Sequence, residues 1–249
     1  MNKQELIQYL KQESFSSEIV SAFSKVKRED FILTSMKEYA YENEPLPIGF
    51  GATISQPYTI AFMLDLLELD KIKDANKKII NRNNEVNLDR DKSKQQKNKD
   101  IRGECIINYN INKNKPKILE IGSGSGYVLA LINELTGESA HESGAEIFGV
   151  ERIEELVKKS REVLKKDKNI KIVHRDGSKG LKEEALFDRI LVSAAFDRIP
   201  ERVIDQLKEG GILVCPVLNS IFQIKKESGK IIKKEFPGFI FVPILEGKE

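Results

Sequence analysis

The chain contains 249 residues, 40% of them hydrophobic and 32% charged, and its formal net charge is +2. This composition is typical of a soluble globular protein with a sizeable core, and it excludes a disulfide-rich or membrane-spanning class. The nearly balanced charge gives the whole chain neither the basic footprint of a nucleic-acid-binding protein nor an acidic tail.

The cysteines and the N-terminus indicate a cytoplasmic protein. Cys105 and Cys215 belong to no CxxC or Cys/His spacing, so we expect no disulfide framework and no metal site. The first residues lack the apolar segment of a secretion signal. No apolar run reaches the length of about 18 residues that a membrane span needs, so we expect no membrane association.

The N-terminal part predicts short helices followed by a shaped loop. Apolar residues recur at helical spacing between residues 4 and 23, and the break at residues 14–17 contains serines that can cap a second helix. Residues 44–57 are rich in Pro and Gly, which excludes a regular helix and predicts a stiff loop. After Pro57 the apolar spacing is again helical.

Residues 70–116 predict a flexible insertion. Residues 71–117 contain 14 Lys or Arg and 6 Asp or Glu, and Asn is frequent. Such a segment cannot bury enough apolar surface to offset its chain entropy. A basic arm that touches RNA is the alternative, although only Tyr109 is available there for base stacking.

From Lys117 onward, apolar strands alternate with helical segments, which is typical of βαβ units around a parallel sheet. We expect an α/β fold: a doubly wound, mostly parallel, Rossmann-like sheet with helices on both faces, an N-terminal helical extension and C-terminal antiparallel strands. The predicted strands are Lys117–Ile121, Ile147–Val150, Ile170–Val173, Asp188–Val192 and Gly211–Cys215, the predicted helices Tyr127–Leu135, Ile153–Lys165 and Glu201–Lys208, and the predicted C-terminal pair Lys230–Phe236 and Gly238–Leu245.

A glycine-rich turn follows the first predicted strand and indicates a cofactor site. Gly122, Gly124 and Gly126 form GxGxG with Glu120 two positions before them. Glycines at the end of a strand let a ligand approach the backbone, and the following helix offers unpaired N–H groups. The spacing differs from the GxGxxG of dinucleotide-binding proteins and resembles motif I of the class I methyltransferases, which bind S-adenosyl-L-methionine.

Two later carboxylates extend this prediction. Glu151 ends the second predicted strand, where a carboxylate can accept both ribose hydroxyls of an adenosyl group. Asp176 and Gly177 follow the third strand, where an Asp can accept from an adenine amino group. Taken singly, each of these residues has an ordinary structural explanation as a turn or a helix-end charge. In this order and spacing they predict an adenosyl site.

The sequence outside the glycine turn resembles the protein-L-isoaspartate (D-aspartate) O-methyltransferase family over nearly the whole chain apart from the insertion. The most specific part is residues 45–57, where Pro-Leu-Pro-Ile-Gly leads into Thr-Ile-Ser-Gln-Pro. The resemblance continues in order through Leu119–Tyr127, Val150–Arg152, Asp176–Gly177, Phe187–Ile190, Ala194–Ala195, Ile199–Pro200, Gln206–Leu207, Gly210–Gly211 and Phe241–Pro243. Ala52, Ser123 and Leu218 depart from the residues that the family usually has there.

The resemblance implies methylation of the free α-carboxylate of L-isoaspartyl residues in damaged proteins and peptides, which starts repair through a succinimide. It also implies site residues. Those of the catalytic loop are Thr53 and Ser55, those facing substrate are Ile54, Ser55, Ala194 and Ala195, and those binding S-adenosyl-L-methionine are Glu120, Gly122, Ser123, Gly124, Gly126, Glu151, Arg152, Asp176 and Gly177.

Carboxyl methylation explains why the sequence contains no histidine-centred catalytic group. A carboxylate with an ordinary pKa is ionised at neutral pH, so the reaction needs no general base. The protein must align the reacting atoms and exclude water, and Ser55 on a Pro-braced loop can hydrogen-bond the incoming carboxylate. Alternatively, the hydroxyls of Thr53 and Ser55 only satisfy backbone groups of the turn. We expect His141 and His174 to be structural or surface residues.

The expected organisation is one structural domain made of residues 1–69 (N-terminal helices and substrate loop), 70–116 (insertion) and 117–249 (cofactor-binding core). The expected partners are isoaspartyl-containing proteins and peptides, with no stable nucleic-acid partner, and the expected oligomeric state is a monomer. Two other functions remain open from the residues alone. One is methylation of a tRNA nitrogen or a small metabolite. The absence of an NPPY-like tetrapeptide after the fourth strand argues against nitrogen methylation. The other is a non-catalytic adenosyl- or RNA-binding role.

Overall fold

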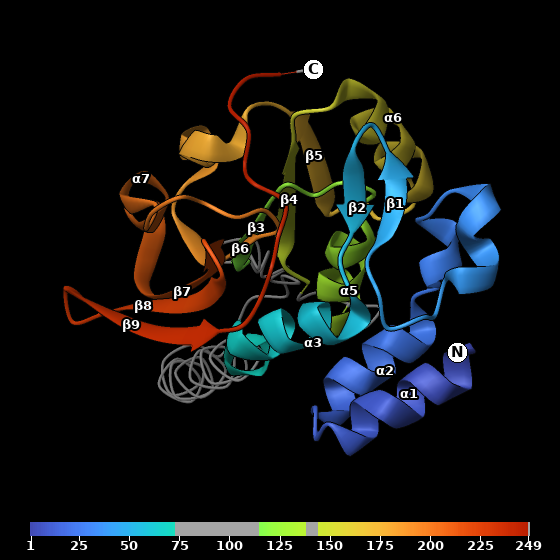
Figure 1. Cartoon of the computed structure of the whole chain (residues 1–249). Helices are drawn as coiled ribbons and strands as arrows, with labels where there is room; N and C mark the ends of the chain where they lie inside the picture. The colour runs from blue at the N-terminus through green and yellow to red at the C-terminus, as the bar shows by residue number, and fades with distance from the viewer. Residues whose placement is uncertain (73–114, 138–143, 249) are drawn as a thin grey trace, which may run out of the picture.

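A seven-stranded sheet forms the centre of the computed structural model, which describes residues 1–72, 115–137 and 144–248 (Figure 1). The strand order is β5-β4-β3-β6-β7-β8-β9; the first five strands run parallel and the last two antiparallel. This confirms the expected mostly parallel sheet with antiparallel C-terminal strands. The strands are β3 (Lys117–Ile121), β4 (Glu146–Glu151), β5 (Ile170–His174), β6 (Phe187–Val192), β7 (Leu207–Val217), β8 (Ser220–Glu227) and β9 (Lys230–Pro237).

The two faces of the sheet pack against different layers. Along β3, Ile118 lies in one hydrophobic cluster, whereas Leu119 and Ile121 lie in the other, as the alternation of side chains in a strand requires. The first cluster contains residues of the helices α1 (Lys3–Gln12), α2 (Ser17–Lys25), α3 (Pro57–Leu66), α5 (Tyr127–Thr136) and α6 (Glu154–Val163). The second face carries, among the described residues, the one-turn helix α7 (Glu201–Ile204) and two 3₁₀ turns, η4 (Gly177–Lys179) and η5 (Lys182–Glu184).

The N-terminal helices begin where the sequence provides caps. Asn2 and Glu5 form a capping box at the start of α1, and the Ser16 hydroxyl accepts from the Ile19 N–H at the start of α2. Pro57 occupies the first turn of α3, where its missing N–H costs nothing. The predicted helices, with their break at residues 14–17, are therefore confirmed.

The Pro- and Gly-rich segment forms a small antiparallel hairpin, which the sequence predicted only as a stiff loop. Strands β1 (Leu46–Gly49) and β2 (Ala52–Ile54) pair with Leu46 opposite Ile54. At the tip, Gly49, Phe50 and Gly51 all have positive φ angles of 98°, 55° and 70°, so glycines on both sides of Phe50 make the tight reversal possible. In Figure 1 the hairpin tip reaches α6 (Glu154–Val163), where Phe50 contacts Lys159.

Three C-terminal predictions were wrong. The helix expected at Glu201–Lys208 is only the single turn α7, because Leu207 already pairs with Phe187 at the start of β7. The sequence prediction missed β8, which is the partner of β9 through a turn at Ser228 and Gly229. Residues 238–245 form no strand of the sheet. They make only a bridge between Pro243 and Ala195.

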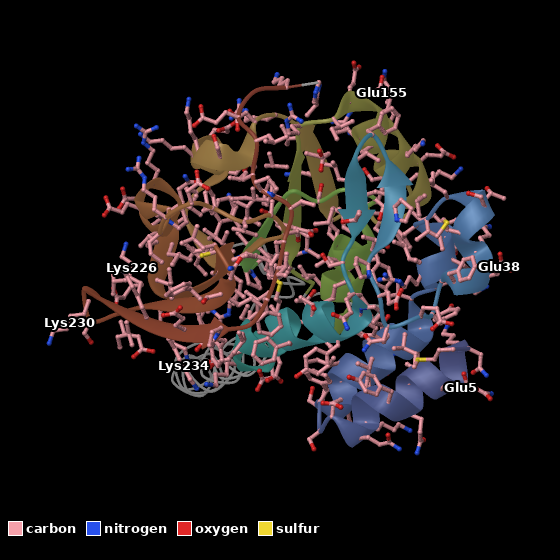
Figure 2. The ribbon with its side chains drawn as sticks, viewed as in Figure 1. Glu5, Glu38, Glu155, Lys226, Lys230 and Lys234 are labelled. Carbon is pink, nitrogen blue, oxygen red and sulfur yellow. The ribbon has the colours of Figure 1, made fainter. Side chains whose placement is uncertain are left out.

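β9 is one end of the sheet, and its residues are largely exposed. Lys230, Lys233 and Lys234 lie on it, and Figure 2 shows the side chains of Lys230 and Lys234 projecting from the hairpin. The predicted insertion lies outside the described residues except for its first three and last two positions, as do Cys105 and His141. In the part of the chain that the structure describes, no helix is both long and apolar enough to cross a membrane.

Candidate active site

A cavity of about 240 Å³ opens at the carboxyl ends of the central strands. In a parallel α/β sheet, ligands bind in this position because the loops that follow neighbouring strands meet there. Its lining combines three parts of the chain: the hairpin tip (Phe50, Gly51, Ala52, Thr53), the turns after the strands (Ile121, Gly122, Gly124, Val150, Glu151, Arg152, Ile153, Gly177, Ser193, Ala194) and the C-terminal segment (Val242, Pro243, Ile244, Leu245).

The glycine turn after β3 has the backbone that the sequence predicted. Gly122, Gly124 and Gly126 have φ angles of 77°, 51° and 87°, which L-residues rarely adopt. A side chain on Gly124 would also approach the Ile48 methyl group of the hairpin to 3.2 Å. The turn therefore keeps its backbone open to a ligand and packs directly beneath β1.

Glu151 ties the glycine turn to the end of β4. Its Oε2 accepts from the Gly124 N–H at 2.8 Å, and its Oε1 accepts from the N–H groups of Arg152 at 2.8 Å and Ile153 at 3.0 Å. A carboxylate has about four acceptor positions, so three backbone donors leave one for a ligand hydroxyl unless a backbone bond is exchanged. The side chain is 6% exposed and lies at the cavity wall.

Asp176 and Arg152 both bind the backbone of Gly247 in the C-terminal segment. The Asp176 Oδ2 accepts from the Gly247 N–H at 2.9 Å, and the Arg152 Nε donates to the Gly247 carbonyl at 3.3 Å. Burial favours a higher pKa for Asp176, but the hydrogen bonds from Gly247 and Ser178 outweigh it and hold the pKa below its usual value. Next to it, a side chain on Gly177 would meet Ile121 at 2.6 Å, so only glycine fits.

Two buried oxygens under the glycine turn have no hydrogen-bond partner among the described residues: Glu120 Oε2 and Ser123 Oγ. The other Glu120 oxygen accepts from the Ser193 hydroxyl at 2.8 Å. Burial raises the pKa of Glu120 to about 8, the Ser193 hydrogen bond opposes this rise, and the charge of Glu151 adds to it. Ser193 lines the cavity, so the Glu120 carboxyl lies one side chain behind the cavity wall.

The hairpin presents two hydroxyls that the fold itself does not use. Neither the Thr53 nor the Ser55 hydroxyl has a hydrogen-bond partner in residues 1–72, 115–137 and 144–248. Thr53 lines the cavity, whereas Ser55, two residues later, is half-buried and is not one of the lining residues. The alternative explanation, that both hydroxyls satisfy backbone groups of a tight turn, therefore finds no support in these contacts.

The remaining predicted residues divide into those at the cavity and those behind it. Gly122, Gly124, Glu151, Arg152, Gly177 and Ala194 line the cavity with Thr53. The Ile54 side chain is 5% exposed and belongs to the core, so only its backbone can face a substrate. Ala195 uses both its backbone groups on the C-terminal segment, donating to the Val242 carbonyl and accepting from the Ile244 N–H, each at 2.8 Å.

The sequence prediction missed the C-terminal residues of the lining and the aromatic tip residue Phe50. The Phe50 ring lies 5.2 Å from the Lys159 ammonium of α6, so a cation–π contact holds the tip. Phe50 and Phe241–Pro243 lay within the motifs of the family resemblance, but nothing local assigned them to the site, because they reach the cavity only through long-range folding. His174 contacts the Arg152 carbonyl at 2.9 Å. No three His, Cys, Asp or Glu side chains of the described part are grouped to hold a metal ion.

The residues present fit S-adenosyl-L-methionine. The open glycine backbone and the carboxylate at the end of β4 offer close approach and an acceptor on one side of a single cavity. A dinucleotide or nucleoside triphosphate would require a different glycine spacing or a P-loop lysine.

The model of the protein-L-isoaspartate(D-aspartate) O-methyltransferase family matches residues 1–77 and 103–249 of the chain. The chain belongs to this family. Both the substrate hairpin and the cofactor turn lie in the matched residues, whereas residues 78–102 of the predicted insertion do not.

Individual members of the isoaspartate O-methyltransferase family resemble the chain along almost its whole length. The protein-L-isoaspartate O-methyltransferase of Ignicoccus hospitalis is 35% identical, covering 98% of this chain and 97% of its own. The protein-L-isoaspartate O-methyltransferase of Fervidobacterium nodosum is 33% identical, covering 96% of this chain and 99% of its own. A crystal structure of the Plasmodium falciparum protein with S-adenosyl-L-homocysteine is 26% identical, with a TM-score of 0.68 and coverage of 98% and 99%.

Proposed function

We propose that the cavity is the active site of an S-adenosyl-L-methionine-dependent protein-L-isoaspartate O-methyltransferase, with Ser55 and Thr53 on its substrate side. The enzyme methylates the free α-carboxylate of L-isoaspartyl residues in damaged proteins and peptides. The family match across both the hairpin and the glycine turn carries this conclusion. It favours isoaspartate over the two other functions open from the residues, a tRNA or metabolite methyltransferase and a non-catalytic binding protein.

The proposed cofactor residues divide by position. Gly122, Gly124 and Glu151 face the cavity, Asp176 adjoins it, and the side chains of Glu120 and Ser123 are buried outside the cavity lining. When bound, S-adenosyl-L-methionine would supply an electrophilic methyl group, which a substrate carboxylate oxygen would accept in line as the methyl–sulfur bond breaks and S-adenosyl-L-homocysteine leaves. The protein supplies no base, because the substrate carboxylate is already ionised at neutral pH.

The chain's own contribution is alignment and exclusion of water. The free Ser55 hydroxyl can donate one hydrogen bond to the substrate carboxylate, while the hairpin tip on one side and residues 242–245 on the other narrow the opening of the cavity. Correct orientation of reacting groups can lower a barrier by several kcal/mol, on the order of 7 or more in favourable cases. We further propose that the enzyme acts as a cytoplasmic monomer without a stable nucleic-acid partner.

The test compares two peptides that differ only in one linkage. Incubation with methyl-labelled cofactor is expected to label the isoaspartyl peptide and leave the aspartyl peptide unlabelled. The label is expected to leave as methanol in mild base, as a methyl ester does. Equal labelling of both peptides, or label that resists base, would refute the isoaspartate assignment while leaving cofactor binding intact.

A further inference from the structure

Arg28 is a buried cation at the base of the hairpin. It belongs to the 3₁₀ turn η1 (Arg28–Asp30) and is 0% exposed. One guanidinium nitrogen, Nη2, donates to the Ser55 carbonyl at 2.9 Å and to the Glu44 carbonyl at 3.3 Å. Glu44 lies two residues before β1 and Ser55 directly follows β2, so one nitrogen holds together the two ends of the hairpin.

The same guanidinium also contacts the helix that follows the glycine turn. Its central carbon lies 5.3 Å from the ring centroid of Tyr127, the first residue of α5, which directly follows Gly126 of the glycine turn. The Tyr127 ring is itself fixed by Phe23 and Phe31, at centroid distances of 6.2 and 5.4 Å. Arg28 therefore bridges the backbone of Ser55 and a rigid residue next to the glycine turn.

Arg28 is a buried cation without a carboxylate partner in the part of the chain that the structure describes. Burying a guanidinium is costly unless it is paired, yet Arg28 makes no salt bridge to a carboxylate among the described residues, and its Nε and Nη1 have no hydrogen-bond partner there. Burial lowers its pKa to about 10, so the group remains charged at neutral pH. A buried charge that binds the backbone of Ser55 and packs on the residue after the glycine turn is a candidate for function.

We propose that Arg28 is a positioning residue for methyl transfer. By binding the base of the hairpin and packing on Tyr127, it fixes the position of the Ser55 hydroxyl relative to the glycine turn. The inference rests on the proposed function of the cavity. Because Arg28 does not line the cavity, it acts through Ser55 and touches neither cofactor nor substrate.

The test compares Arg28→Met, which keeps the aliphatic volume but loses the donors, with Arg189→Met. Arg189 is a matched control, since it is also buried and donates to backbone carbonyls, at 2.5 Å to Leu67 and 3.2 Å to Glu68. These carbonyls lie at the end of α3 that is farther from the hairpin. We expect Arg28→Met to lower kcat for an isoaspartyl peptide by about 10- to 100-fold. The Kd for S-adenosyl-L-homocysteine by calorimetry should stay within about threefold, and Arg28→Lys should recover part of the lost kcat.

For Arg189→Met we expect a lower Tm and an unchanged kcat in the folded protein. The proposal is overturned if Arg28→Met keeps kcat within twofold of wild type. It is also overturned if Arg189→Met lowers both kcat and Tm as much as Arg28→Met does, or if Arg28→Met weakens cofactor affinity by the same factor as kcat. Should Arg28→Met fail to fold, Arg28→Lys decides: a kcat lowered at least threefold with unchanged Kd supports the role, and an unchanged kcat overturns it.

A double-mutant cycle shows whether Arg28 acts through Ser55. In a Ser55→Ala background the hydroxyl to be positioned is gone, so Arg28→Met is expected to lower kcat by less than about threefold further. Full additivity of the two losses would overturn action through Ser55. If the wild-type enzyme methylates isoaspartyl and aspartyl peptides equally, the proposed function is wrong. The role of Arg28 is still tested in that case, because the Kd for the cofactor product and the ratio of variant kcat to wild-type kcat can be measured with either peptide.

Discussion

Glu120 is an acid that the fold places where water does not reach it. It is 1% exposed, and Gly149, which has no side chain, lies beside it in β4 in register with it. A pKa of about 8 means that the carboxyl holds a proton in the folded protein at neutral pH, whereas in the unfolded chain it ionises above about 4.5. The folded state therefore binds more protons between these two values, and stability falls as pH rises through this window.

Replacing Glu120 by Gln should remove this dependence. The variant keeps a neutral side chain of the same size that can still accept from Ser193. Its free energy of unfolding is expected to match that of the wild type near pH 5 and to exceed it increasingly up to pH 8, by on the order of 4 kcal/mol at most. Urea denaturation at several pH values measures the difference.

Glu155→Gln is the control for Glu120→Gln. Its side chain lies exposed on α6 and points away from the protein (Figure 2), so its profile should follow the wild type. A constant difference between Glu120→Gln and wild type across pH 5–8 would contradict a buried, protonated Glu120.

Single residues also show why some family departures are tolerated. Leu218 stands where the family commonly has Gly, and it has a φ angle of 53° in the turn between β7 and β8. A left-handed Leu costs on the order of 1 kcal/mol, which is affordable at an exposed turn outside the cavity lining. Ala52 lies in the cavity lining itself, so its departure bears on substrate contacts.

At the scale of elements, the C-terminal segment is the part that the sequence described least well. Figure 1 shows it passing from the end of β9 over the central strands towards the top of the molecule. It pairs with Ala195 after β6 and reaches Asp176 after β5 through Gly247. The Gly247 N–H thus occupies one acceptor position of the Asp176 carboxylate, which we expect to accept from the adenine amino group.

A chain ending at Leu245 should bind the cofactor product more tightly. It loses the Gly247 contacts with Asp176 and Arg152 and keeps the cavity-lining residues 242–245. Since one hydrogen bond contributes about 0.5–1.5 kcal/mol, the Kd for S-adenosyl-L-homocysteine is expected to fall by about two- to tenfold in calorimetry. A chain ending at Lys248 retains Gly247 and serves as control. Weaker binding by the shorter chain would show that the segment completes the site instead.

The glycine turn and the C-terminal segment illustrate what a sequence can predict. The turn is local: its three glycines, strand and helix are contiguous, so residue type and spacing predicted its backbone and its place in the sheet. The C-terminal segment depends on partners about 50 to 70 residues away, at Ala195 and Asp176, and nothing in its own apolar run predicts them. The sequence prediction also missed the contacts of Arg28, because its partners Ser55 and Tyr127 lie far from it in the chain.

At the scale of the whole molecule, one hydrophobic cluster joins the N-terminal helices to the cofactor side of the sheet. Leu10 of α1, Phe23 of α2 and Leu64 of α3 share it with Ile118 of β3 and Leu131 of α5. The parallel sheet was predictable because every central strand is a short apolar run. The β7–β8 pairing was not, because Leu207–Val217 looks like the end of a helix followed by a strand.

Removing residues 78–102 should leave the enzyme active. The family model matches the residues on both sides of this segment and does not match the segment itself. With a short Gly-Ser replacement, we expect kcat and KM for the isoaspartyl peptide within about twofold of wild type and a similar Tm. A collapse of peptide methylation with an intact fold would show that these residues take part in substrate binding.

The lysines of β9 have a consequence for an enzyme that handles damaged polypeptides. Its substrates are exposed chain segments with free backbone N–H and C=O groups, and, within the part of the chain that the structure describes, β9 ends the sheet with a row of such groups of its own. Lys230, Lys233 and Lys234 make adding a further strand there costly, because each charge would have to give up water. A repair enzyme built this way can bind an unfolded segment in its cavity without nucleating an aggregate at its edge.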